Sequence, residues 1–145
     1  MENSIEKCIS HFQYLTSIIE KFDFENSIVR IKNDCKRNID MNYDDIAIKR
    51  KADALYGEIS LSLFVCLYEN DEKVVSINYK TKGLFKSTDA DNEAEFKELL
   101  KINGLAVLYS LARAHITTLS SVAGIDNINI PMINVYEYIK QKKDN

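Results

Sequence analysis

The sequence predicts an α+β fold, in which helices pack on one face of an antiparallel sheet. Several runs between residues 12 and 85 alternate apolar with polar side chains, which is the period of a half-buried strand. After residue 91 the apolar residues recur at every third or fourth position, which is the period of a helix. Strands followed by helices are typical of α+β domains. We expect one domain over residues 1–145, with an N-terminal extension (1–11), a sheet (12–88) and a helical part (89–145).

The clearest strand signal surrounds the four polar residues 69–72, "ENDE". The run 56–68, "YGEISLSLFVCLY", alternates apolar with polar residues, and so does the run 73–85, "KVVSINYKTKGLF". Two alternating runs joined by a short polar segment predict an antiparallel hairpin. One face of such a sheet is buried, and the other remains available to solvent.

Two further strands are predicted before this hairpin. In residues 12–24 the bulky apolar residues of one parity predict a single buried face; they are Phe12, Tyr14, Ile18, Phe22 and Phe24. A helix is the alternative for the beginning of this run, because Ile5, Cys8, Ile9, Phe12 and Leu15 have helical spacing. We therefore expect a strand from Phe12 onward and allow a short helix before it. Residues 39–43, "IDMNY", alternate again, and Ile46 and Ile48 extend this strand after a change of face.

The C-terminal part predicts a long amphipathic helix, an extended strip and a short helix. Asp89 or Asp91 is expected to cap the long helix, and Gly104 to bend or break it. The segment 126–139, "DNINIPMINVYEYI", contains Pro131, the only proline of the chain. Neither a helix interior nor a central strand favours proline, because it lacks a backbone donor. We expect an extended connection here, followed by a helix from about residue 134 to 142.

Composition excludes several classes of function. The net charge is −3 and the pI is near 5.4, so there is no electrostatic reason to expect a nucleic acid as the partner. No stretch approaches the roughly 18 apolar residues of a membrane span. The first residues carry no recognisable secretory signal, and we therefore expect a cytoplasmic protein.

The sequence contains no recognisable catalytic, metal or cofactor site. His115 has no acid four residues away to form a metal-ligating pair, and we expect it to be a packing residue on the long helix. The three cysteines are too far apart for a disulfide framework or a zinc site, and we expect reduced, buried thiols. Nucleotide-binding loops and nucleophile elbows are absent from the sequence. We conclude that the protein binds a partner and is not an enzyme.

Residues 105–139 resemble the carboxy-terminal half of the SecB export-chaperone family. The positions that carry the resemblance are Ala112-Arg113, Ile116-Thr117 and the segment Asn129-Ile130-Pro131-Met132-Ile133-Asn134. The similarity runs without gaps for about 35 residues and continues more weakly through residues 12–25, "IDMNY", the hairpin and "KGLF" (82–85). The resemblance implies a four-stranded antiparallel sheet with a long helix and a short C-terminal helix on one face. It also implies a homo-oligomer, a dimer of dimers.

By the same resemblance, the protein is an ATP-independent chaperone that holds unfolded polypeptides in apolar grooves and delivers precursors to the Sec export machinery. The implied client-binding residues are Ile28, Ile31, Ile39, Met41, Tyr43, Tyr138 and Ile139. In this interpretation, the strip around Pro131 positions the final helix as one wall of the groove.

The sequence departs from the family at the surface that docks the SecA motor. Glu25 fits the acidic pattern, but Lys21 replaces a neighbouring acid, and Ser76 and Asn78 stand where apolar and acidic residues are expected. These departures favour a specialised chaperone of one partner, such as an antitoxin. A domain that binds a small hydrophobic ligand and a purely structural oligomer are the remaining alternatives.

Overall fold

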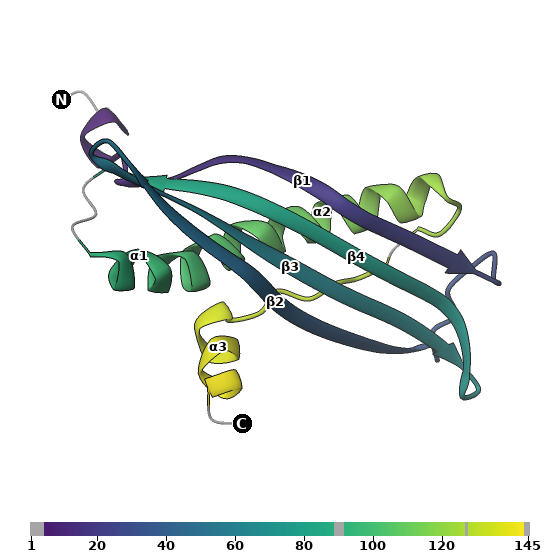
Figure 1. Cartoon of the computed structure of the whole chain (residues 1–145). Coiled ribbons are helices and arrows are strands. Elements are labelled where there is room, and N and C mark those ends of the chain that lie inside the picture. Colours follow the sequence, from purple (N-terminus) through teal and green to yellow (C-terminus); the bar gives the residue numbers. More distant parts are fainter. Residues whose placement is uncertain (1–4, 89–91, 127, 144–145) are drawn as a thin grey trace.

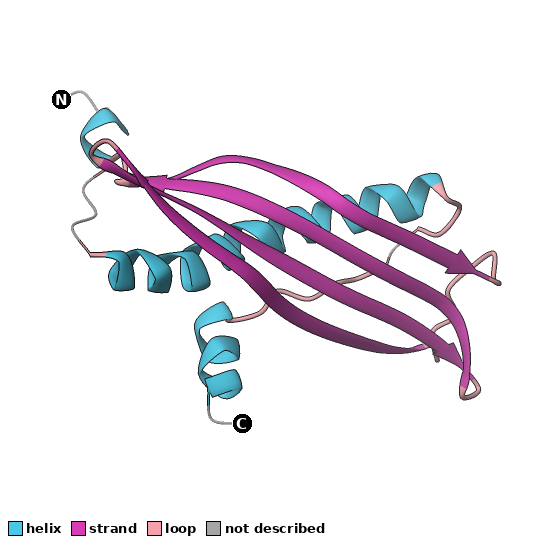
Figure 2. Ribbon diagram, viewed as in Figure 1, coloured by secondary structure: helices cyan, strands magenta, loops and turns pink. Residues whose placement is uncertain are grey.

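The computed structural model describes residues 5–88, 92–126 and 128–143. A short 3₁₀ helix, η1 (Ile5–Cys8), precedes four long strands, β1 (Phe12–Asn26), β2 (Lys36–Lys51), β3 (Ala54–Glu69) and β4 (Glu72–Ser87). The helical part comprises α1 (Glu93–Leu99), a π-helical turn η2 (Leu100–Gly104), α2 (Leu105–Val122) and α3 (Val135–Lys143). The four strands form one antiparallel sheet in the order β1-β4-β3-β2. The helices lie on one face of it, so the α+β prediction is confirmed (Figure 1, Figure 2).

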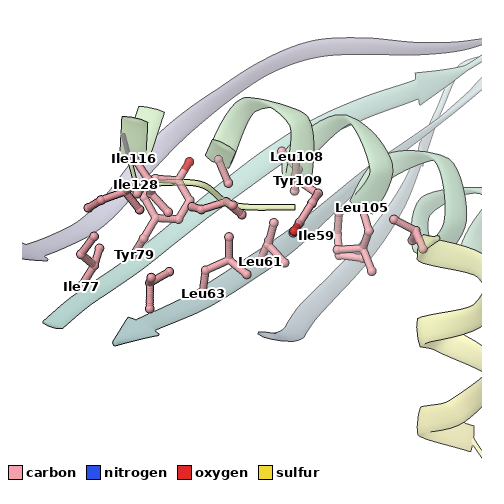
Figure 3. Packing of buried hydrophobic residues seen from close by; sticks show 14 of the residues in the cluster. Ile59, Leu61, Leu63, Ile77, Tyr79, Leu105, Leu108, Tyr109, Ile116 and Ile128 are labelled. Carbon is pink, nitrogen blue, oxygen red and sulfur yellow. The ribbon is translucent and has the colours of Figure 1, made fainter. Parts of the chain in front are cut away.

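The predicted hairpin is β3 and β4, and it forms the centre of the sheet. Strict alternation along both strands places one set of side chains, such as Leu61, Leu63 and Ile77, under α2 (Figure 3). The helix contributes Leu105, Leu108 and Ile116 to the same core, and all six of these side chains are fully buried. The turn residues Asn70 and Asp71 both have positive φ, 51° and 64°, as a two-residue hairpin turn requires. We call the opposite, solvent-facing side of the sheet the open face.

The single buried face expected for residues 12–24 is wrong at Ile18. The register of β1 against β4 shifts between Tyr14 and Thr16 and again between Ile19 and Lys21. Each bulge reverses the direction of the following side chains, so Ile18 pairs with Lys82 on the open face and is 58% exposed. Phe12, Tyr14, Phe22 and Phe24 do lie opposite residues of β4 that face the helices.

The other expectations for the N-terminal half agree with the structure. The chain is a strand from Phe12 onward, and the short helix before it is η1. The change of face in β2 is a bulge between Asp44 and Ala47, where Asp45 has a φ of 56°. It turns Ile46 and Ile48 toward the helices, as predicted.

The long helix begins and continues differently from the prediction. Asp89 and Asp91 lie outside the described residues, and the N-cap is Asn92, whose side-chain oxygen accepts from the Ala94 N–H at 2.8 Å. Gly104 does not break the helix, since its φ of −62° and ψ of −47° are helical, and the irregularity is the π turn that ends at this residue. Close packing of the helix depends instead on two glycines of the sheet. A Cβ at Gly57 would lie 2.4 Å from Leu100 Cδ1, and one at Gly83 would lie 2.7 Å from Leu108 Cδ2.

The structure also tests the expectations for His115 and for the three cysteines. His115 is half-buried on α2, and its Nδ1 lies 2.8 Å from the hydroxyl of the buried Tyr79, so the packing role is confirmed. The three cysteines are unpaired as expected, but Cys8 is exposed, and Cys35 and Cys66 are only half-buried. The expectation of buried thiols is therefore wrong, because Cys8 lies on η1, which buries none of its residues.

Candidate functional site

Six of the predicted client-binding residues lie half-buried at the border of the core. We call them the apolar band: Ile28, Ile31, Ile39, Met41, Tyr43 and Tyr138. Ile39, Met41 and Tyr43 face the helices from β2. Because β2 is an edge strand, a neighbouring strand, β3, flanks these side chains on one side only. Ile28 and Ile31 belong to the crossover, the segment 27–35 that joins β1 to β2. All six side chains pack against the core while part of each remains accessible.

Ile139, the seventh predicted residue, is 4% exposed and belongs to the core. Together with the buried Val135, it anchors α3 in the core, where this helix contacts η2. The Ile139 side chain therefore lies beneath the band, and its burial holds α3 and the neighbouring Tyr138 in position.

Tyr138 joins α3 to the edge strand. Its hydroxyl donates to the Met41 carbonyl at 2.6 Å, and its ring meets the Tyr43 ring edge-on with centroids 6.4 Å apart. Burial, together with the nearby Tyr43 hydroxyl, raises the pKa of Tyr138 to about 12, so the phenol stays protonated and keeps donating. The Lys142 ammonium lies 5.0 Å from the Tyr43 ring centroid and 5.7 Å from that of Tyr138, and it donates to the Asn42 side chain.

The strip is the segment 125–134 between α2 and α3, and its described residues, 125–126 and 128–134, contain no helix or strand (Figure 1). Ile125, Ile128 and Ile130 are buried, whereas Met132 is 81% exposed. The described residues of the strip belong to no strand ladder, and side chains bond three of their carbonyls instead. The Tyr109 hydroxyl donates to the Pro131 carbonyl at 2.5 Å, and Arg113 Nε donates to the Ile130 carbonyl at 2.8 Å.

A third donor comes from the sheet, because Arg37 of β2 binds the Asn129 carbonyl. The strip is thus clamped between α2 and the beginning of β2. Sequence reasoning identified the strip but missed these three donors. A signal was present, since a proline in an apolar segment leaves carbonyls that no regular ladder will pair.

Further apolar side chains are exposed on the crossover, on the strip and on α3. Val29 lies between Ile28 and Ile31 on the crossover and is 96% exposed. Met132 and Ile133 of the strip and Tyr136 of α3 are also exposed. Sequence reasoning did not assign these four residues to the site, although their positions beside predicted members could have indicated them. A surface cleft of about 620 Å³ also borders the strip, between Ile128–Ile130 and the Arg113 and Thr117 side of α2.

The positions expected to dock SecA do gather on one surface. Glu25 pairs in register with Ser76, and Asp23 pairs with Asn78, all on the open face at the end of β1. Lys21 lies 3.4 Å from Asp23 and forms an ion pair with it. This arrangement leaves Glu25 as the acid that no neighbouring lysine is seen to neutralise among the described residues.

Two further features are absent from the part of the chain that the structure describes. No cluster of three or more metal-ligating side chains occurs within residues 5–88, 92–126 and 128–143. None of the helices in that part of the chain is long and apolar enough to cross a membrane.

Comparison with known proteins identifies the fold. No model of a known protein family matches the sequence, and no curated protein matches it. The structure is similar to that of the SecB-like chaperone Rv1957 of Mycobacterium tuberculosis, in complex with a ChAD peptide from the antitoxin HigA1. The TM-score is 0.62, the match covers 84% of this chain and 90% of that chain, and the sequence identity is 13%. The resemblance to SecB is therefore confirmed at the level of the fold, and this chain is a divergent example of the SecB-like architecture.

Proposed function

We propose that this protein is an ATP-independent chaperone that holds unfolded polypeptide segments against the apolar band and the exposed apolar residues beside it. The observation that carries the proposal is the presence of accessible apolar side chains on the crossover, the strip and α3 of a SecB-like fold. All three segments adjoin β2: the crossover leads into it, Arg37 of β2 binds the strip, and Tyr138 of α3 binds the Met41 carbonyl. Clients of many sequences can use such a surface, because apolar contact makes few directional demands.

The energetics are adequate for transient holding. Burial of about 400 Å² of client apolar surface contributes roughly 10 kcal/mol at about 25 cal/mol per Å². Ordering an unfolded chain removes a large part of this gain. Several weak sites on one oligomer then increase retention through avidity. Oligomerisation is therefore part of the proposal, and we place the contact between two copies at the exposed edge of β1.

Between the two variants of this function, we favour a dedicated partner such as an antitoxin over delivery to SecA. Lys21, Ser76 and Asn78 weaken the acidic docking surface that delivery would need. The similar SecB-like protein is described with an antitoxin peptide, which is a precedent for such a partner on this fold. The small-ligand alternative is disfavoured, because at Gly57 and Gly83 the long helix packs directly on the sheet and fills the space that a ligand would need.

The test combines solution mass with an aggregation assay. A tetramer, near four times the chain mass of 16.7 kDa, should suppress aggregation of an unfolded client without nucleotide. Met41→Asp should weaken client retention, but Met41 also contacts the core, so the fully accessible Val29→Asp is the cleaner variant. Ile5→Asp is the matched control, because Ile5 is 80% exposed on η1 at the other end of β1 from the crossover. An unimpaired Val29→Asp variant, or a monomer without holding activity, would contradict the proposal.

A further inference from the structure

The charges that border the apolar band are mostly of one sign, although the chain as a whole has a net charge of −3. Basic residues occur on the crossover, on β2, on α2 and on α3; they are Arg30, Lys32, Arg37, Arg113, Lys140 and Lys142. The three acids of β2 lie elsewhere: Asp40 and Asp44 pair in register with Phe64 and Ser60 on the open face, and Asp45 forms an ion pair with Lys80 of β4 at 3.3 Å. On the crossover, strip and α3 the acids are Asp34, Asp126 and Glu137.

Four of the six cations are held by neutral partners, and the other two, Arg30 and Lys32, are exposed on the crossover. Arg37 and Arg113 donate to the carbonyls of the strip, and Lys142 contacts an amide oxygen and two tyrosine rings. Lys140 lies 5.7 Å from the Tyr136 ring centroid. Across residues 5–88, 92–126 and 128–143, the ion pairs involve other lysines, such as Lys101 and Lys143 with Glu98. Carbonyl oxygens, amide oxygens and tyrosine rings hold a cation in position but do not neutralise its charge. The charge therefore remains available to a carboxylate of a client.

We propose that the preferred client segment is an extended apolar stretch flanked by aspartate or glutamate. This inference rests on the proposed holding function and adds to it the chemistry of the client. The apolar stretch would cover the band, and the flanking carboxylates would meet Arg30 and Lys32 on the crossover and Lys140 and Lys142 on α3. Lysine- or arginine-flanked segments of the same apolar content would be repelled there. Exposed charge pairs each contribute little, so the preference depends on several of them and on low salt.

The experiment uses the full chain and two labelled peptides with one shared apolar core. One peptide has aspartate and glutamate at both flanks, and the other has lysine and arginine. Fluorescence anisotropy should show binding of the acidic-flanked peptide that is about tenfold tighter at low ionic strength, with a difference that shrinks as salt is added. Equal affinities, or tighter binding of the basic-flanked peptide, would overturn the client preference while leaving the holding function intact. Failure of both peptides to bind would overturn the holding function itself, and the inference with it.

A charge-reversal pair locates the effect. Arg30→Glu combined with Lys32→Glu changes two exposed side chains of the crossover, so the fold should be unaffected while the preference for acidic flanks is lost. Lys49→Glu combined with Lys51→Glu changes net charge by the same amount at the far end of β2 and should leave the preference unchanged. An equal loss in this control would assign the preference to net charge and overturn the inference. Displacement of the acidic peptide by a single-stranded oligonucleotide at equal affinity would assign the cations to phosphate and overturn it as well.

Discussion

At the residue scale, the two glycines under the long helix determine how closely it approaches the sheet. Gly83→Ala would place a methyl group 2.7 Å from Leu108 Cδ2 and 2.9 Å from Phe85 Cε2. We expect a loss of about 1–3 kcal/mol in the free energy of unfolding, because a packed core has no room for the added carbon. Urea denaturation measures the change.

Gly104→Ala is the matched control for this substitution. Its Cβ would lie 3.5 Å from Phe85 Cε2, an ordinary contact distance, and Gly104 has helical φ and ψ. Alanine should therefore be neutral or stabilise the protein by up to about 1 kcal/mol, since it favours helix over glycine. Equal destabilisation by both variants would mean that the helix does not lie on the sheet as described.

The raised pKa of Tyr138 predicts a loss of folding stability at alkaline pH. Its pKa is raised from an ordinary value of 10 to about 12 by burial and by Tyr43, so the folded state favours the protonated phenol. The contribution of this group to stability is complete below pH 10 and is lost as pH rises through about 12. Burial also raises the pKa values of Tyr79 and Tyr109, so all three act in the same direction.

Replacement of Tyr138 by phenylalanine should therefore reduce, but not abolish, the fall in stability above pH 10. Unfolding by urea at a series of alkaline pH values measures it, and tyrosinate absorbance follows the titration directly. A slope identical to that of the wild type would show that Tyr138 titrates in the same way in the folded and unfolded states. Tyr136→Phe is the control, because Tyr136 is exposed on the same helix.

At the element scale, the strip depends on side-chain donors for its position. Tyr109→Phe keeps the ring but removes the hydroxyl that donates to the Pro131 carbonyl. Loss of this bond should cost about 1 kcal/mol of stability. Amide hydrogen exchange in residues 128–133 should become faster, while exchange in the β3–β4 hairpin changes much less. Uniformly faster exchange would indicate that Tyr109 supports the whole core and has no particular effect on the strip.

Elements differ in how well the sequence predicts them, and the reason is physical. The β3–β4 hairpin and the long helix bury one face continuously, so their periods are visible in the residues themselves. The bulges of β1 are different, because they depend on how that strand pairs with β4. Ile18 has the parity of Phe22 but the opposite direction, and composition alone does not distinguish the two. The cap at Asn92 was missed because acids nearby were equally good candidates.

At the scale of the whole molecule, the candidate site also depends on contacts that the sequence alone does not reveal. Of the seven residues that the resemblance implies, six lie half-buried in the band, whereas Ile139 is buried in the core because of how α3 turns. The basic residues around the apolar band were not predicted, because Arg37 and Lys142 are far apart in the sequence. In the fold, β2 and α3 bring them to the same surface. Charged residues from separate segments are seen to border one surface only once the fold is known.

The final prediction concerns assembly, and it follows from the exposed edge of β1. β1 pairs with β4 on one side only, and Tyr14, Leu15, Ile18 and Ile19 are exposed along it. An unpaired strand with exposed apolar residues is a natural site for pairing with another chain. We therefore expect Leu15→Lys combined with Ile18→Lys to lower the solution mass, because lysine on an edge strand opposes association.

Sedimentation equilibrium measures that mass, and thermal unfolding of the dissociated chain checks that its fold is kept. Phe64→Lys is the matched control, since Phe64 is similarly exposed on the open face but lies on β3, which is paired on both sides. It should leave the mass unchanged. A lower mass with Phe64→Lys, together with an unchanged mass in the β1 variant, would place the contact between copies on the open face.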